Sequence, residues 1–252
     1  MEESDRYLHS EITSRGRPTS QRESTFFFTI SVRTSAWFDL TESAVSQLPS
    51  NLAETLSRAC DPGPTPPGLV GHDVHFYSSE ESLVRSVVAF LSAGIRVGQP
   101  AIVIATQPHR TAFAAGLREK GLDPDEILAG RVVVWLDARE TLNSFMEDKL
   151  PNRELFMATV GSVFEKVLGQ RQYLVVRAFG EMVDLLFKDG NIEGAVLLEE
   201  LWNELASSYK YSLLCAYSIE NFLHESGVAD FRRVCDQHTN ALPLDTFRKN
   251  VA

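Results

Sequence analysis

The sequence predicts an α/β domain with a mainly parallel central sheet and helices on both faces. From about residue 70 onward, short apolar runs alternate with amphipathic stretches, which is typical of parallel strands joined by crossover helices. The expected strands are residues 72–77, 101–106, 131–136, 173–178 and 213–217. The expected helices are residues 80–93, 108–120, 153–168, 181–187 and 192–209. In such folds ligands bind beyond the carboxyl ends of the strands.

Individual elements carry their own local signals. The helix at 108–120 is followed by Gly121, a residue type that commonly ends helices. The strand at 131–136 is apolar over consecutive positions, as expected when both faces of a sheet are covered. The helix at 192–209 should turn one apolar stripe inward, formed by Ile192, Ala195, Leu198, Leu201, Trp202 and Leu205. Glu193, Glu200 and Glu204 should face outward.

The chain is expected to have three parts: a leader at 1–69, the α/β domain at 70–243 and a tail at 244–252. Within the leader, residues 1–24 lack hydrophobic periodicity and should be disordered. Residues 25–32 favour a strand, and Leu48, Leu52 and Leu56 recur at helical spacing. Residues 61–68 hold four prolines and two glycines, so they predict a linker and a domain boundary.

Charge and composition exclude several classes of partner. A formal net charge of −10 and no basic run argue against direct nucleic-acid binding. The acidic start differs from a signal peptide, and no apolar stretch is long enough to span a bilayer. Three widely spaced cysteines, Cys60, Cys215 and Cys235, fit reduced thiols better than a disulfide framework. Together these features predict a cytoplasmic protein without a membrane segment.

Nucleotide hydrolysis by the usual route is not expected. A phosphate-binding loop needs flexible glycines and a Lys that follows Gly, and no Gly-Lys pair occurs in the chain. The turn after the first strand contains Glu80 and Glu81, whose carboxylates at a helix start would repel a triphosphate. No nucleophile elbow or comparable catalytic motif is present either, so the chain is not predicted to be an enzyme.

Four ordered motifs carry a resemblance to a known family. They are His72–Tyr77, Ala93–Pro100, Arg177–Met182 and Leu213–Tyr217. Together they resemble the MEDS domain, a sensory domain of methanogens, methylotrophs and the dichloromethane-responsive regulator, from His72 to about Pro243. The order of elements is also similar to that of the KaiC branch of RecA-like ATPases. In that comparison the Walker loop would fall at residues 77–82, where this sequence departs from it completely.

The resemblance implies a small-molecule sensor of a signalling system. The family is proposed to sense hydrocarbon derivatives and is often joined to a histidine kinase or a DNA-binding output domain. Nine residues follow Pro243, too few for either output, so signalling is expected to pass to a separate partner protein. A ligand-free interaction or homo-oligomerisation module and a degenerate nucleotide-binding protein remain alternatives.

The ligand site is predicted at the carboxyl ends of the strands. Its apolar walls would come from Phe76, Tyr77, Trp135 and Phe179, and its polar selectivity from Asp137, Arg177 and Glu181, with His72 as a further candidate. Arg177 and Glu181 are expected to form a charge-assisted pair, because Glu181 would lie in the first turn of a helix and reach back to the guanidinium. Whether this pair reads a ligand or only fixes the turn stays open.

No metal site is assigned from the sequence. His72, His75, Cys235 and His238 show no established ligand spacing, so structural histidines are favoured. Cys215, inside an apolar strand, is interpreted as a small buried hydrophobe, and a redox or metal role for Cys235 with His238 is a minority alternative. The family has a Glu-Glu-Leu-Trp-Asn stretch that resembles the one beginning at Glu199, but neighbouring acidic residues on a helix usually form a solvated face.

Overall fold

The computed structural model describes residues 64–123, 133–169, 174–224 and 226–242. The strand predicted at residues 25–32, the helical leucines at 48–56, Cys60 and the tail at 244–252 lie outside this part of the chain. The division into leader, domain and tail therefore stays a prediction. Within the described residues no helix is long and apolar enough to cross a membrane.

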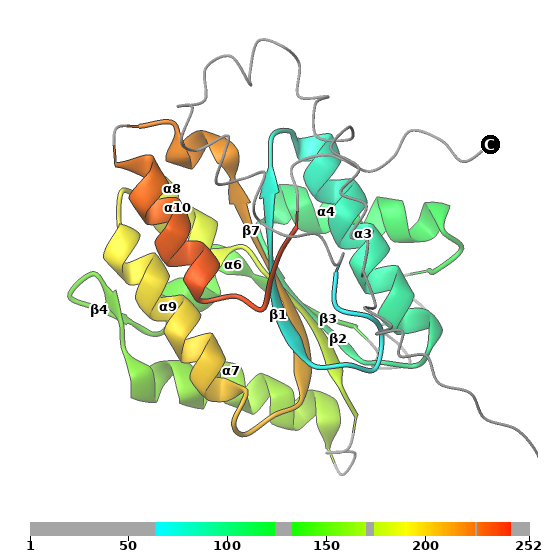
Figure 1. The fold of residues 1–252 in the computed structure, drawn as a ribbon. Helices are drawn as coiled ribbons and strands as arrows, with labels where there is room; N and C mark the ends of the chain where they lie inside the picture. Colours follow the sequence, from blue (N-terminus) through cyan, green and yellow to red (C-terminus); the bar gives the residue numbers. More distant parts are fainter. Residues whose placement is uncertain (1–63, 124–132, 170–173, 225, 243–252) are drawn as a thin grey trace, which may run out of the picture. The chain divides into compact units, whose positions relative to one another are not determined.

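The central sheet has six strands, all parallel, in the order β3-β2-β6-β7-β1-β8 (Figure 1). They are β1 (Gly71–Tyr77), β2 (Ala101–Ala105), β3 (Val133–Asp137), β6 (Val176–Gly180), β7 (Tyr211–Ser218) and β8 (Asn240–Leu242). A short antiparallel hairpin pairs β4 (Met146–Glu147) with β5 (Leu150–Pro151). The strands of the central sheet are almost wholly buried, apart from β3 and β8, which lie at its two edges.

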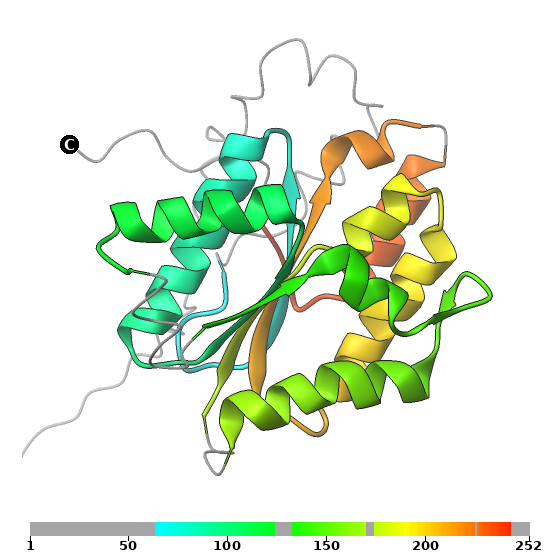
Figure 2. The same ribbon diagram turned by 180° about the vertical axis from the view of Figure 1, so that it is seen from behind.

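Seven α-helices of the described residues cover the two faces of the sheet. Helices α3 and α4 lie on one face, and α6 to α10 lie on the other (Figures 1 and 2). Their bounds are α3 (Glu80–Arg96), α4 (Gln107–Glu119), α6 (Ala138–Asn143), α7 (Arg153–Leu168), α8 (Met182–Lys188), α9 (Ile192–Leu205) and α10 (Gly227–Asp236), with a 3-10 turn η1 (Ile219–Phe222) after β7. The predicted α/β class with a parallel sheet is confirmed.

Each face of the sheet has its own hydrophobic core. Because successive side chains of a strand point to opposite faces, β1 turns Val74 and Phe76 toward the helices α6 to α10 and Tyr77 toward α3 and α4. The larger core contains a chain of aromatic contacts in which Phe76 packs on Phe231 with a centroid distance of 4.3 Å and meets Phe222 edge-on. The smaller core includes Phe113 and Phe179 in T-shaped contact.

Predicted and observed elements agree best where the hydrophobic pattern is long. Helix α7 has the bounds expected from the sequence, whereas α9 ends at Leu205 rather than Tyr209. Strand β6 begins at Val176, three residues later than predicted, and its Arg177 pairs with Ala101 at the start of β2. This shift moves Arg177 from the end of the expected strand to its beginning.

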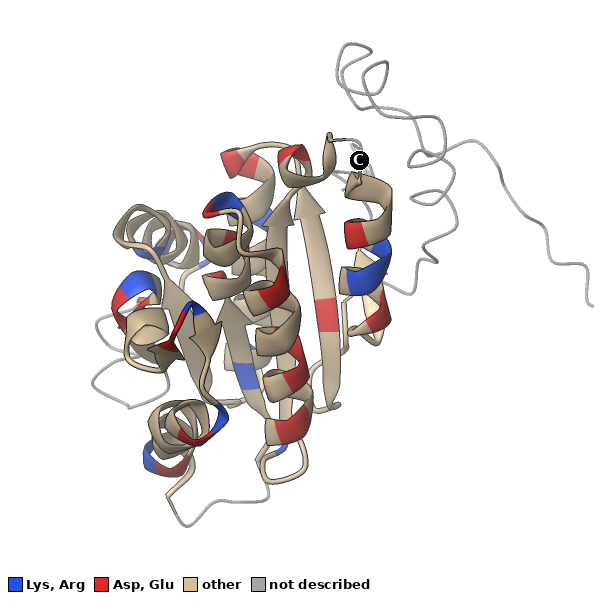
Figure 3. Cartoon of the chain, turned by 90° about the vertical axis from the view of Figure 1, so that its left-hand side faces the viewer, with Lys and Arg blue, Asp and Glu red and all other residues tan. Residues whose placement is uncertain are grey.

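Charged residues lie mostly on the helices (Figure 3). Two charged side chains of the central sheet are buried, Asp73 in β1 and Arg177 in β6. Burial of a charge is costly unless hydrogen bonds and a countercharge compensate it, so each of these positions needs specific partners.

Candidate functional site

The carboxyl ends of β1 and β7 meet at the buried carboxylate of Asp184 in α8. Its Oδ2 atom accepts a hydrogen bond from the Tyr77 hydroxyl at 2.9 Å and lies 2.8 Å from Lys188 Nζ. Its Oδ1 atom accepts from the Ser218 backbone N–H at 2.9 Å and from the Asn221 amide at 2.6 Å. Burial and the Asp184 carboxylate raise the pKa of Tyr77 above its usual range, so the phenol stays a hydrogen-bond donor. Tyr77 thus lies at the predicted edge.

A second buried carboxylate, Glu181, lies at the carboxyl ends of β2 and β6. It accepts hydrogen bonds from the Thr106 backbone N–H and from His109 Nδ1. The other ring nitrogen of His109 lies 2.5 Å from the carboxylate of Glu80 at the start of α3. Burial disfavours the charged ring, but hydrogen bonds and charge from Glu181 and Glu80 outweigh it and raise the pKa of His109 to about 9. At neutral pH His109 is therefore a cation held between two carboxylates.

The end of β3 contributes Asp137 to the same edge. Its Oδ1 atom caps helix α6 by accepting from the backbone N–H groups of Arg139 and Glu140 at 3.0 and 3.1 Å. Its Oδ2 atom accepts from Arg110 at 2.9 Å. Trp135, two residues earlier, is only partly buried and packs against the smaller core. Asp137 therefore has a structural capping role that sequence reasoning did not assign to it.

A groove of about 550 Å³ lies between α3 and α4 and reaches this edge at Glu80. Val84 and Val88 give it apolar surface, and Glu119 is among its charged lining residues. Gly116 lets the two helices approach closely, because a Cβ atom at that position would lie 2.6 Å from Val88 Cγ2. The groove is within the size range of small-molecule sites. Through Glu80 and His109 it is connected to the buried Glu181.

Arg177 does not lie at this edge, and its predicted pairing with Glu181 is wrong. Four residues of strand separate the two by about 13 Å along the backbone, and each has its own partners. Arg177 donates to the backbone carbonyls of Phe90 at 3.2 Å and Thr65 at 2.9 Å, and to the Ser212 hydroxyl at 3.1 Å. Its guanidinium lies 3.9 Å from the centroid of the Phe90 ring. Only 1% of Arg177 is exposed.

The charge of Arg177 is balanced by Asp73. Burial lowers the pKa of Arg177 to about 10, and the nearby Asp73 carboxylate opposes this shift. Asp73 accepts from the Thr65 backbone N–H at 2.6 Å, the Thr65 hydroxyl at 2.8 Å and the Asn240 amide at 2.8 Å. Thr65, which lies on the leader side of the predicted boundary, is thus bonded into the core of the domain.

The predicted aromatic walls are not brought together. Phe76 belongs to the core under α6 to α10, and Phe179 belongs to the core under α3 and α4, on the opposite face of the sheet. Each is no more than 1% exposed. Of the eight predicted site residues, the structure gathers three at the carboxyl edge: Tyr77, Asp137 and Glu181.

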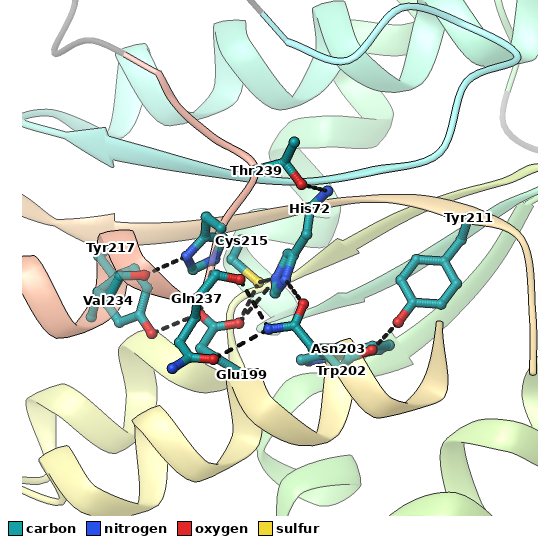
Figure 4. A network of polar contacts seen from close by, with 11 residues as sticks. His72, Glu199, Trp202, Asn203, Tyr211, Cys215, Tyr217, Val234, Gln237 and Thr239 are labelled. Carbon is teal, nitrogen blue, oxygen red and sulfur yellow. Dashed lines mark hydrogen bonds and ion pairs between the residues drawn. The ribbon is translucent and has the colours of Figure 1, made fainter. Parts of the chain in front are cut away.

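The last predicted residue, His72, belongs to a separate polar cluster between the sheet and α9 (Figure 4). The cluster joins His72 of β1, Glu199 of α9, Cys215 of β7 and His238, which follows α10. Glu199 lies at its centre, with its carboxylate 3.1 Å from His72 Nε2 and 3.3 Å from His238 Nε2. The Cys215 Sγ atom lies 3.2 Å from Glu199 and 3.4 Å from His72 Nε2. Tyr217 donates its hydroxyl to Glu199 at 2.7 Å.

The cluster is shut off from solvent. Glu199 and Cys215 are 0% exposed, and the side chain of His238 is equally inaccessible. Burial, reinforced by the Glu199 carboxylate, raises the pKa of the Cys215 thiol well above its usual value. Burial also lowers the pKa of His238, although the Glu199 carboxylate opposes this shift. The prediction that Glu199 lies on a solvated face is therefore wrong. Cys215 is buried, as predicted, but its neighbours Glu199 and His72 are polar.

A signal for Glu199 was present in the sequence. It lies four residues after Ala195 and three before Trp202, within the apolar stripe of α9, whereas Glu200 lies on the exposed face. Asp184 and His109 gave no comparable signal, because their contacts join elements distant in the chain.

The described residues form an α/β domain built on a six-stranded parallel sheet, with polar groups at its carboxyl edge and a buried polar cluster around Glu199. A family model for the MEDS domain, described as the MEthanogen/methylotroph, DcmR Sensory domain, matches residues 71–237. Because the match covers more than half of the chain, the chain belongs to the MEDS family. No curated protein matches it.

Proposed function

We propose that this chain is a cytoplasmic small-molecule sensory module that acts through a signalling partner, such as a histidine kinase or a transcription regulator. Membership in a sensory-domain family supports a role in signalling. The observation that carries the proposal is the chain of contacts from the groove between α3 and α4 through Glu80 and His109 to Glu181. A ligand in the groove would act on His109, a charged histidine whose partner Glu181 also accepts from Thr106 at the end of β2.

The charges of the groove favour a particular class of ligand. Its lining holds three carboxylates, Glu80, Glu81 and Glu119, against two cations, Arg85 and Lys120. Behind it, Glu181 is paired with His109 and Asp184 with Lys188. Glu80 and Glu81 both lie in the first turn of α3. Carboxylates at a helix start repel anions, so the site suits an uncharged or cationic small molecule with an apolar part, such as an amine or an alcohol derived from a hydrocarbon. The same feature ranks a degenerate nucleotide-binding role last. Kinship with the KaiC branch of RecA-like proteins, without their phosphate loop, is part of this proposal.

A thermal-shift screen of the full chain tests the proposal. A panel of short-chain amines, alcohols, halogenated alkanes, carboxylates and Mg²⁺-ATP should yield a rise in melting temperature with an uncharged or cationic compound, since binding to the folded state stabilises it. His109→Gln should abolish most of that rise. His224→Gln, at a half-exposed histidine after η1, is the matched control and should keep it.

Two outcomes would redirect the assignment. A shift with Mg²⁺-ATP alone would favour the nucleotide-binding alternative. If no compound shifts the melting temperature and the ligand-free chain forms a stable oligomer in light scattering, the interaction-module alternative gains support. The exposed Leu150 and Leu155, near the hairpin and the start of α7, would then be the first surface to mutate.

A further inference from the structure

We propose that His72, Glu199, Cys215 and His238 bind one zinc ion. They come from β1, α9, β7 and the segment after α10, and their ligand atoms all lie within 4.8 Å of one another. Two imidazoles, a thiol and a carboxylate are the ligand types that zinc takes in proteins. This site is separate from the groove and does not depend on the sensory proposal.

The outer hydrogen bonds fix which nitrogen of each histidine faces the cluster. His238 Nδ1 lies 2.6 Å from the Val234 carbonyl, so it must carry the proton as donor. His72 Nδ1 lies 2.8 Å from Asn203 Oδ1. The orientation of Asn203 is set in turn, because its Nδ2 atom donates to the Gln237 carbonyl at 2.9 Å. In both rings the Nδ1 atom therefore bonds outward and the Nε2 atom faces the cluster, the arrangement in which histidines bind metals.

Hydrogen bonds within the cluster do not satisfy all of its buried polar atoms. Tyr217 and the Cys215 thiol can each donate to Glu199. The Nε2 atom of His238, however, is buried and has no hydrogen-bond partner among the described residues, although it lies beside the Glu199 carboxylate. A cation between His238 Nε2 and the Glu199 carboxylate would bind both groups at once.

Three of the spacings in the cluster are close to those of a tetrahedral zinc site. With zinc at about 2.1 Å from nitrogen or oxygen and about 2.3 Å from sulfur, the edges of a tetrahedron are about 3.4 Å between N and O and about 3.6 Å between N and S. His72 Nε2 lies 3.1 Å from Glu199 Oε2 and 3.4 Å from Cys215 Sγ, and His238 Nε2 lies 3.3 Å from the other carboxylate oxygen, Oε1. The ligand atoms of the four residues lie within 4.8 Å of one another, so the most distant pair would have to close by about 1 Å for all four to hold the ion.

Burial assigns the ion a structural role. Four protein ligands fill a tetrahedral zinc, so no position is left for substrate. The ion would tie β1 and β7 to α9 and to the segment that leads into β8. A cavity of about 380 Å³ borders the cluster at His72 and Asn203.

Metal analysis of the full chain, expressed without a histidine tag, tests the proposal. After exposure to Zn²⁺ and dialysis, mass spectrometry of the metal content should find close to one zinc per chain. Cys215→Ser and Glu199→Gln should lower this content several-fold. Cys235→Ser is the matched control, because Cys235 lies one helical turn before His238 but outside the cluster, and it should keep full occupancy.

Cobalt substitution keeps the test valid even if a variant fails to fold. The unmodified chain loaded with Co²⁺ should show a thiolate-to-cobalt charge-transfer band and the visible bands of tetrahedral cobalt. A chelator should remove both and lower the melting temperature, and Zn²⁺ should restore it. If the unmodified chain holds neither zinc nor cobalt after dialysis, the proposal is wrong. Metal retained equally by Cys215→Ser and the unmodified chain would also overturn the assignment of ligands.

Discussion

Replacing Arg177 by Met should destabilise the protein even without a ligand. Met keeps much of the apolar stem but removes the guanidinium that donates to the Thr65 and Phe90 carbonyls and to Ser212. Losing two or more buried hydrogen bonds from a charged donor costs about 3 kcal/mol, and the unbalanced Asp73 carboxylate adds to it. For a chain of this size, about 3 kcal/mol corresponds to a fall in Tm of about 6–12 °C.

Urea denaturation followed by circular dichroism measures the free energy of unfolding of the unmodified chain, Arg177→Met and a control. Arg85→Met is the control. Among the described residues Arg85 forms an exposed ion pair with Glu81 one helical turn away, so the substitution should cost less than about 0.5 kcal/mol. A loss in Arg177→Met no larger than in the control would refute the structural role. A lost ligand response with intact stability would instead return Arg177 to the ligand site.

His109 and His75 should make the stability of the protein depend on pH in opposite directions. The residue at which the chain starts should also affect stability. The folded-state pKa of His109 is raised to about 9, so its contribution of about 2 kcal/mol to the free energy of unfolding is present below pH 6.5 and lost as pH rises through 9. Urea titrations at several pH values should show a smaller loss of stability with rising pH in His109→Gln than in the unmodified chain. Burial lowers the pKa of His75 to about 4, so the free energy of unfolding should fall by about 3 kcal/mol as pH drops from 6.5 to 4. If the free energy of unfolding of His75→Leu falls equally steeply over this pH range, the prediction is wrong. A chain that starts at Pro64 should be about 2–3 kcal/mol more stable than one that starts at Pro67, because only the former keeps Thr65; equal midpoints in urea would show that its hydrogen bonds contribute nothing.

The fold class could be predicted because five of the six strands of the central sheet and most helices are marked by local sequence patterns. Helix α7 has a long amphipathic pattern, and its predicted bounds are confirmed. Elements with short or mixed patterns were missed: α6 has six residues, and β8 has three and is defined by its pairing with β1. The late start of β6 depends on its register with β2 and β7, which no local pattern records.

The site was less predictable because its geometry depends on which strand ends are neighbours. Tyr77 and Glu181 follow directly from the rule that ligands lie beyond strand ends, and both lie there. Arg177 was misplaced by the shift of β6. The cluster around Glu199 joins residues more than 100 positions apart, as in the contact between His72 and Glu199, so only its helical stripe position gave a local hint.

The position of β8 beside β1 has a consequence for how this domain can be connected. Thr65, just before β1, and Asn240, at the start of β8, both donate to the carboxylate of Asp73. The first and last segments of the described residues therefore lie at neighbouring points around a single side chain. A short peptide that links these two points, with new termini opened elsewhere, should give a circular permutant that retains the sheet. By the same geometry, any displacement of Asp73 is transmitted to both flanking segments together.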